Sequence, residues 1–334
     1  MTVTNNIHGG RADYSRMRLG ELRKRLANLP ELTSFRGLTI FGAGSYARLE
    51  ASEYSDIDMF FLTVGNKDDV SEPRTNSMRF FGKVIEIVDK MNFPKFSNDS
   101  EYLVILHTND ILSNLGSRKD DHENYFTARM LLLLESHCLY GKPVFDDITA
   151  KIINSYFKDY PDHKHTFQPM FLLNDICRFW KTLLLNYENK RNFLLEAEDI
   201  EERRTRQKVR NFKLKYSRMT TCFASIAALG SHAAPVTEEQ VVELTRLTPR
   251  ERLQSITSLV PTAENAVRDV LDRYSWFLEM TGLPTVELEG HFSDKQKRTE
   301  MFQKANEYGD SMFRLLQAID ETDTRLRLLR NLVI

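Results

Sequence analysis

Cysteine is scarce in this chain, and its three copies lie far apart at Cys138, Cys177 and Cys222, each inside an apolar helical pattern. The paired spacings that form a disulfide framework or a zinc site do not occur. We therefore expect reduced cysteines packed in a hydrophobic core, as in a cytosolic protein.

The sequence also lacks a long apolar run and a dominant charge. No stretch approaches the roughly 20 apolar residues that cross a bilayer, and no apolar segment follows a basic region near the start. The 46 basic and 47 acidic residues almost cancel, so no overall field favours nucleic acid or a membrane. Internal repeats and low-complexity tracts are missing as well. We expect a cytoplasmic protein with no membrane partner.

What is present favours two domains, for which 334 residues are long enough. Short apolar runs typical of strands, at about 37–42, 56–64 and 102–107, alternate with helical patterns at 14–29 and 77–91. From about residue 122 the pattern is helical almost to the end. We expect an α/β (α+β) fold: a small mixed-sheet catalytic domain over residues 13–120, then a larger all-helical domain over 121–334 with a sub-boundary near 231–236.

Capping chemistry marks the starts of several helices in the second part. Thr237 precedes Gln240 by three residues, Thr248 precedes Pro249 and Glu251, and Ser293 precedes Gln296. The expected helices are 122–140, 146–158, 169–190, 196–229, 237–246, 249–258, 262–281 and 294–330, the last with a break near Asp320.

The most informative stretch is residues 42–62, GAGSYARLEASEYSDIDMFFL. Gly44-Ser45 is followed, after ten residues, by Asp56-Ile57-Asp58 at the start of an apolar run. On a strand, Asp56 and Asp58 would point to the same face. Two adjacent carboxylates repel each other unless a cation lies between them. Magnesium takes oxygen ligands and commonly uses one or two carboxylates together with substrate phosphates.

The Gly-Ser pair provides the complementary half of such a site. Gly42 and Gly44 permit a tight turn with positive φ. Its backbone N–H groups and the Ser45 hydroxyl are suited to a phosphate. Carboxylates for a metal beside a turn for phosphate indicate metal-assisted transfer from a nucleoside triphosphate (NTP).

This pattern resembles the motif of the DNA polymerase β-like nucleotidyltransferase superfamily, Gly-Ser followed about ten residues later by Asp-x-Asp. A weaker likeness up to residue 147 is similar to the nucleotidyltransferase module of bacterial PII-uridylyltransferases, without the His-Asp pair of their phosphohydrolase domain. The resemblance implies a Mg²⁺- or Mn²⁺-dependent transferase, with Ser45 on the γ-phosphate and Asp56 and Asp58 on two Mg²⁺ ions.

The resemblance also implies a third carboxylate on the next strand, which completes the metal site and can act as general base. We favour Glu101, at the head of the apolar run 102–107. Asp99 and Glu86 are alternatives, and a solvent-facing strand end is an equally good interpretation of Glu101. Some branches of the superfamily have no third acid.

Basic residues supply further candidates for nucleotide binding. Arg48, between the two motifs, would contact phosphate or order its loop. Arg178 and Lys181 share a helix face with Asn174 and would contact the triphosphate or the acceptor, unless that face is an ordinary solvated stripe.

Residues 203–218 are rich in lysine and arginine and contain no acid. This segment would form a groove for nucleic acid or triphosphate, with Phe212 and Tyr216 available for stacking. A long solvated helix with an acidic start and a basic end is the alternative. Lys213, Lys215 and Arg218, which lie among apolar residues, are the better ligand candidates.

We therefore expect a nucleotidyltransferase that moves a nucleoside monophosphate from an NTP to an acceptor and releases pyrophosphate. A protein side chain fits the uridylyltransferase likeness, whereas an RNA or tRNA 3′ end fits the basic segment. A small molecule, a nucleotide messenger, and a toxin or defence role also stay open. The alternative from another class is a non-catalytic module for nucleotide sensing or protein contacts on the same fold.

Overall fold

The computed structural model describes residues 4–65, 73–94, 96, 102–192, 200–322 and 327–333. They form two compact units, each described here by itself. The sheet unit comprises His8–Lys158, and the helical unit comprises Asp159–Ile334 with Met1–Ile7. The sheet unit therefore runs on beyond residue 120, where the sequence analysis put the domain boundary.

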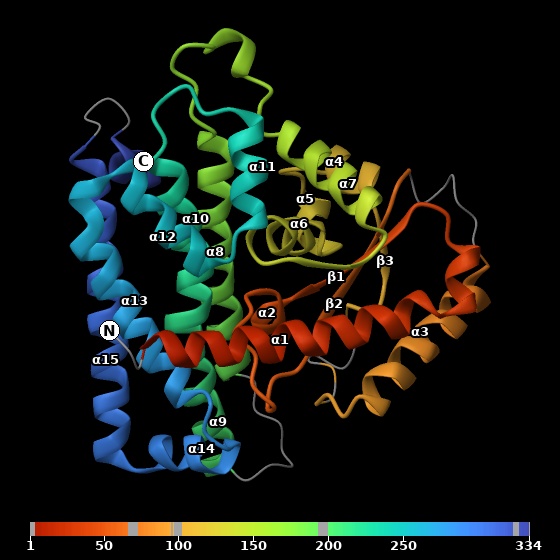
Figure 1. Cartoon of the computed structure of the whole chain (residues 1–334), viewed down its shortest axis with the longest axis horizontal. Coiled ribbons are helices and arrows are strands. Elements are labelled where there is room, and N and C mark those ends of the chain that lie inside the picture. The colour runs from red at the N-terminus through yellow and green to blue at the C-terminus, as the bar shows by residue number, and fades with distance from the viewer. Residues whose placement is uncertain are drawn as a thin grey trace. The chain divides into compact units, whose positions relative to one another are not determined.

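The sheet unit alternates helices with four short strands (Figure 1). Its elements are α1 (Thr4–Ala27), η1 (Pro30–Ser34), β1 (Leu38–Ala43), α2 (Gly44–Ala47), β2 (Asp58–Thr63), α3 (Arg74–Lys90), β3 (Ile105–His107), α4 (Thr108–Ser113), α5 (Arg118–His122), α6 (Tyr125–Leu134), β4 (His137–Tyr140) and α7 (Lys142–Asn154).

The sheet has the strand order β3-β2-β1-β4. β1 pairs antiparallel with both β2 and β4, whereas β2 and β3 are parallel. A parallel neighbour requires a crossover connection, and α3 lies in the one between β2 and β3. The mixed α/β layout expected from the sequence is confirmed.

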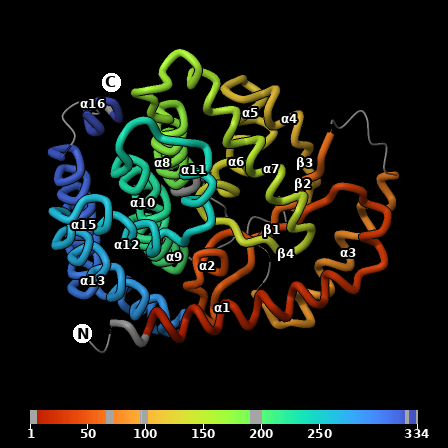
Figure 2. The backbone as a smooth tube through the Cα atoms, turned by 45° about the horizontal axis from the view of Figure 1, so that its top comes forward, coloured from red at the N-terminus to blue at the C-terminus, as the bar shows by residue number. Residues whose placement is uncertain are grey.

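Helices cover both faces of this sheet, α1 and α3 on one side and α6 and α7 on the other (Figure 2). Side chains alternate between the faces along each strand. Ile40 and Phe61 join the core formed with α1 and α3. Phe41 points the other way, where it stacks on Phe60 at 5.2 Å and contacts Phe145 of α7 at 6.2 Å.

Two expected strands are shorter in the structure. β2 starts at Asp58 and not at 56, because its last pair with β1 is Ala43↔Asp58 and β1 turns into α2 at the next residue. Asp56 thus precedes the strand. β3 covers only Ile105–His107 of the expected 102–107.

The expected helix 122–140 is wrong. α6 ends at Leu134, Glu135 adopts φ −153°, and β4 follows as an edge strand of the sheet. The run of leucines in α6 is apolar on every side, so its periodicity does not indicate where the helix stops. This strand and α7 extend the sheet unit past residue 120.

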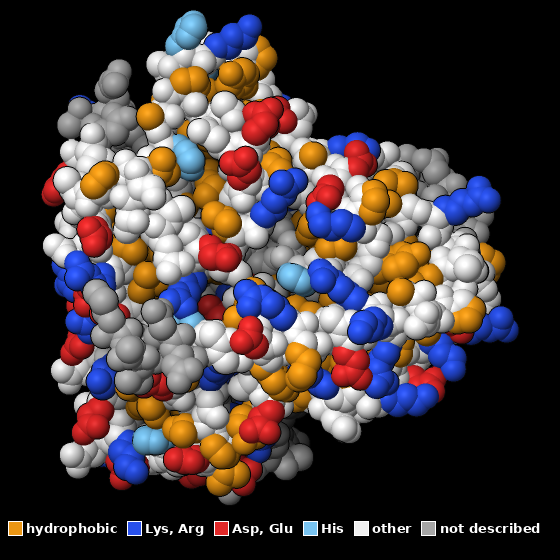
Figure 3. Space-filling model, in the orientation of Figure 1, with side chains coloured by type: hydrophobic (Ala, Val, Ile, Leu, Met, Phe, Trp, Pro, Cys, Tyr) orange, Lys and Arg blue, Asp and Glu red, His pale blue; other side chains and the backbone are white. Residues whose placement is uncertain are grey.

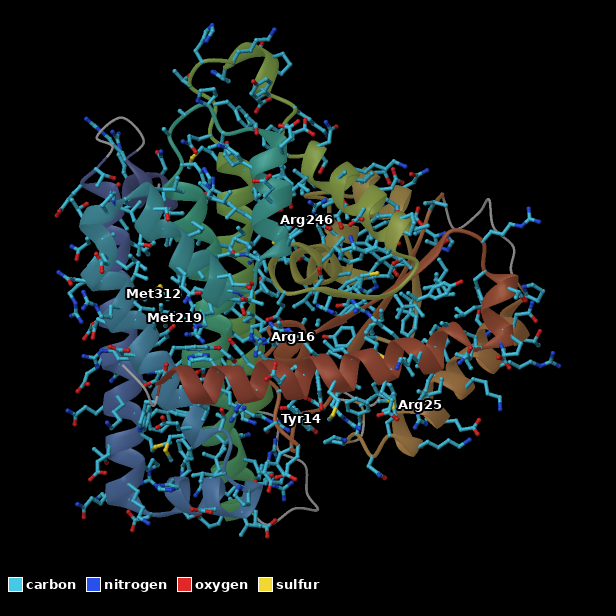
Figure 4. All side chains as sticks on the ribbon, in the orientation of Figure 1. Tyr14, Arg16, Arg25, Met219, Arg246 and Met312 are labelled. Atoms are coloured by element: carbon cyan, nitrogen blue, oxygen red, sulfur yellow. The ribbon has the colours of Figure 1, made fainter. Side chains whose placement is uncertain are left out.

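β4 is fastened to α1 through Arg23. Its Nε donates to the carbonyl of Cys138 at 2.8 Å, and its Nη2 lies 2.9 Å from Nε2 of His137. Because a guanidinium only donates, Nε2 must accept, so the imidazole is neutral. Burial, and then the charges of Arg23 and Arg16 (both on α1; Arg16 is labelled in Figure 4), lower the pKa of His137 from 6.5 to about 4.

This histidine predicts a pH effect on stability. In the unfolded chain His137 becomes protonated below pH 6.5, whereas in the folded protein it becomes protonated only near pH 4. The contribution of neutral His137 to the free energy of unfolding is therefore complete above pH 6.5. It is lost as the pH falls from 6.5 to 4, by on the order of 2–3 kcal/mol in total. The measurement is urea unfolding from pH 7.5 to 4.5. His137→Gln keeps an acceptor but does not titrate, so the unfolding free energy of this variant should change less with pH. The same pH dependence in wild type and variant would contradict the role of His137.

The helical unit contains helices throughout its described residues. They are η3 (Tyr160–Asp162), α8 (Met170–Asn192), α9 (Ile200–Lys213), the π-helical turn η4 (Leu214–Arg218), α10 (Met219–Gly230), α11 (Glu238–Arg246), α12 (Pro249–Leu259), η5 (Pro261–Ala263), α13 (Glu264–Met280), α14 (Thr285–Ser293), α15 (Lys295–Asp320) and α16 (Leu328–Val333).

The capping predictions are mostly confirmed. Thr237 and Thr248 both form complete capping boxes. At the third start Asp294, not Ser293, caps the helix by accepting from the Lys297 N–H. The expected break near Asp320 is confirmed by the end of α15, while the separate helix α14 was not expected.

Acidic and basic side chains are interspersed over the surface seen in Figure 3, as the balanced composition predicts. Within the described part of the chain, no helix has both the length and the apolar character needed to cross a bilayer.

Candidate active site

The expected turn after β1 forms, and it lies directly on one of the two aspartates. The chain leaves the sheet after Ala43 and enters the single turn α2, in which Gly44 has φ +70°. A Cβ placed on Gly44 would lie 3.1 Å from Oδ2 of Asp58. The carboxylate of Asp58 therefore lies beside Gly44, in the space that a side chain would need, although the two residues are separated in sequence.

The two aspartates flank an anchored residue. Ile57 is fully buried and belongs to the core on the α1 side, whereas Asp56 and Asp58 are each half-buried. In β2, Met59 and Phe61 belong to the same core as Ile57, so Asp58 at the start of the strand is directed to the opposite face. Asp56 precedes the strand, so the strand alternation expected for the pair of aspartates does not apply to it. Asp58 offers hard oxygen donors next to a turn suited to phosphate, and Asp56 supplies a second carboxylate two residues earlier in the chain. Carboxylate oxygens of this kind fit a divalent cation such as Mg²⁺.

Gly44 gives a direct stability test of this geometry. Gly44→Ala should destabilise the protein by about 1–2 kcal/mol, since an L-residue is strained in the left-handed region and the new methyl meets the Asp58 carboxylate. Urea unfolding measures the change. The control is Gly82→Ala on the exposed side of α3, which has open space and should stabilise by about 0.5–1 kcal/mol. Equal effects at both positions would contradict the model of the turn.

Tyr46 anchors the turn in the core. Its ring is 1% exposed and lies 5.3 Å from the ring of Phe93 and 6.4 Å from that of Tyr14 on α1 (Figure 4). Burial, aided by Tyr14, raises the pKa of its hydroxyl, which stays protonated. Ser45 beside it is only half-buried, and Gly42 is buried with Ile57 and Leu139 near its Cα. The turn therefore presents Ser45 while Tyr46 holds it.

Arg48 is buried, and its guanidinium is bound to two carboxylates of the protein. Nε donates to Glu50 Oε2 at 2.8 Å, and Nη1 donates to Glu135 Oε2. This arrangement favours a role for Arg48 in ordering its loop over a role in contacting phosphate. Glu135 was not identified from the sequence, because nothing local links it to a loop so far away in the chain.

The third carboxylate cannot be placed from the described residues. Glu101 and Asp99 both lie outside them. The adjoining Tyr102 packs its ring 4.9 Å from that of Phe60 in β2, the strand that begins at Asp58. Among the residues that the structure describes, no group of three or more His, Cys, Asp or Glu side chains is arranged to hold a metal.

Glu86, the remaining alternative, lies on the exposed side of α3. Its carboxylate accepts from Lys83 at 2.8 Å and from Lys90 at 2.6 Å, and these two hydrogen bonds lower its pKa to about 2. It forms ordinary ion pairs along a solvated helix face.

The other basic candidates belong to the helical unit. Arg178 on α8 is half-exposed and lies 3.5 Å from Asp175, and Lys181 is exposed. Lys213 is exposed at the end of α9, whereas Lys215 in η4 donates to Asn306 at 2.8 Å.

The suggested stacking residues of the basic segment are not available to a base. Phe212 and Tyr216 are fully buried, and Tyr216 stacks between Phe277 at 4.8 Å and Tyr308 at 4.5 Å. Both are core residues, so stacking on nucleic acid by these two rings is ruled out.

Comparison of the chain with protein-family models gives no match, and comparison with curated proteins gives none either.

Proposed function

We propose that this chain is a Mg²⁺-dependent nucleotidyltransferase of the polymerase β-like type, which transfers a nucleoside monophosphate from an NTP to an acceptor and releases pyrophosphate. The observation that carries the proposal is the position of the Asp58 carboxylate beside Gly44. It brings a phosphate-binding element and a hard oxygen ligand together at one end of the sheet.

In this proposal the chain's residues have distinct tasks. Asp56 and Asp58 hold the divalent cations, which neutralise phosphate charge when bound. The backbone of the Gly44–Ser45 turn and the Ser45 hydroxyl bind the triphosphate, while Gly42, which was expected in the turn, lies within β1 just before it. Glu101 accepts the proton of the attacking hydroxyl. The oxygen of that hydroxyl forms a bond to the α-phosphorus, the bond to the bridging α–β oxygen breaks, and pyrophosphate leaves with the electron pair.

Arg178, Lys181, Lys213 and Lys215 are the residues proposed to contact triphosphate or acceptor. The acceptor is a protein side chain or an RNA 3′ end. The site lies in a chain that we propose to be cytoplasmic.

Pyrophosphate release tests the proposal. The purified protein is incubated with each of the four NTPs, Mg²⁺ or Mn²⁺, and whole-cell RNA or protein as the acceptor pool. Release should require metal and stop on addition of EDTA, and label from an α-³²P NTP should enter one of the pools. Binding of Mg·NTP without any release would favour the nucleotide-sensing module, and neither binding nor release would overturn the proposal.

A further inference from the structure

The buried ion network around Arg48 connects the Gly-Ser turn to a distant part of the sheet unit. The side chain of Arg48 is 6% exposed, and those of Glu50 and Glu135 are 5% and 0% exposed. Glu135 lies between the end of α6 and the start of β4. One guanidinium therefore ties the loop after α2 to the helix–strand junction beside β1.

Stability alone does not account for such a network. Removing charges from water costs several kcal/mol per ion, and replacing a buried ion group by apolar side chains of similar volume is often neutral or even stabilising. A guanidinium differs from an apolar side chain in that its planar fork fixes the directions of both partners. The network is thus suited to setting geometry.

The geometry that it sets is that of the turn. The N–H of Glu50 donates to the carbonyl of Ser45 at 2.8 Å, and the N–H of Arg48 donates to that of Gly44 at 3.1 Å. On the other side, Arg11 of α1 donates to the carbonyl of Glu50 at 2.8 Å. Glu50 is therefore held through its side chain, its N–H and its carbonyl. Because its N–H donates to the carbonyl of Ser45, a fixed Glu50 also fixes the position of Ser45.

We propose that Arg48, with Glu50 and Glu135, is a positioning residue that holds the Gly44–Ser45 turn against Asp58, and that its guanidinium does not contact the triphosphate. This inference rests on the proposed nucleotidyl transfer. It replaces the role of nucleotide ligand that the sequence suggests for Arg48.

Three variants test the network. Arg48→Lys keeps the positive charge but removes the fork, so it cannot bind both carboxylates in a fixed geometry. Glu135→Ala removes one anchor and leaves Arg48 in place. Glu135→Gln is the matched control, since its amide oxygen still accepts from Nη1 of Arg48.

The measurements are kcat and the KM for NTP in pyrophosphate release, at a temperature where circular dichroism shows every variant folded. Arg48→Lys and Glu135→Ala should each lower kcat/KM by about 10- to 100-fold, with a raised KM, because small misplacements of binding groups have effects of this size. Glu135→Gln should stay within about threefold of wild type. The double variant Arg48→Lys/Glu135→Ala should be little worse than either single one, because both break the same link.

Each other outcome overturns the inference in a recognisable way. An effect of Arg48→Lys with none of Glu135→Ala means that Arg48 contacts the nucleotide directly. A lower melting temperature with unchanged kcat and KM means that the network is only structural. A wild-type protein that releases no pyrophosphate defeats the proposed function itself, and the positioning role with it.

Discussion

Asp58→Asn is expected to reduce pyrophosphate release by at least about a thousandfold, and Asp56→Asn to have a similar effect. A metal ion contributes several kcal/mol of charge stabilisation in the transition state, and about 4 kcal/mol corresponds to a thousandfold in rate. The amide keeps the size of the carboxylate and removes the charge that holds the cation. Initial rates under saturating NTP and Mg²⁺ measure the loss.

The same substitutions should leave the fold intact. The amide has the shape of the carboxylate, and both aspartates are only half-buried, so each substitution should change the free energy of unfolding by less than about 1 kcal/mol. A loss of activity without a loss of stability is typical of a functional carboxylate.

The control is Glu53→Gln, an exposed carboxylate in the same loop, which should remain within about twofold of wild type. Full activity of the Asp56→Asn/Asp58→Asn double variant would remove these residues from the mechanism.

The largest effect on stability is expected at the buried pair of Asp120 and Arg129. Two parallel hydrogen bonds of 2.8 and 2.9 Å join them, and both side chains are 0% exposed. Burial alone would lower the pKa of Arg129, but the hydrogen bond to Asp120 and the contact with Tyr156 raise it, so the guanidinium keeps its charge. Asp120→Ala leaves this charge in the interior and should cost about 3–5 kcal/mol.

Urea unfolding at pH 7 measures this cost. The control is Asp147→Ala, which removes a pair whose side chains are 54% and 49% exposed and should cost under about 1 kcal/mol. A similar loss of unfolding free energy in Asp120→Ala and Asp147→Ala would show that Asp120→Ala does not leave an uncompensated charge in the interior.

The features that the sequence predicts well are local. The Gly-Ser turn and the Thr237 and Thr248 capping boxes each depend on residues within a few positions of one another. The turn nevertheless needed a structure to show that Gly44 lies against Asp58, because that contact depends on the register Ala43↔Asp58.

The features that the sequence misses depend on distant partners. β4 exists because β1 offers it a second pairing edge, and its own residues His137–Tyr140 follow an apolar run without a strand pattern. Glu135 acquires its role from Arg48, 87 positions earlier. The burial of Phe212 and Tyr216 depends on α13 and α15, and a basic segment gives no indication of it.

The separation between Arg48 and Glu135 also sets the order of events during synthesis. β1, the turn and both aspartates leave the ribosome early, but the second carboxylate of Arg48 and the second neighbour of β1 are made about 87 residues later. At about 5–20 residues per second this delay is roughly 4–17 seconds. The nascent chain therefore carries Arg48 and β1 well before Glu135 and β4, which pair with them, have emerged from the ribosome.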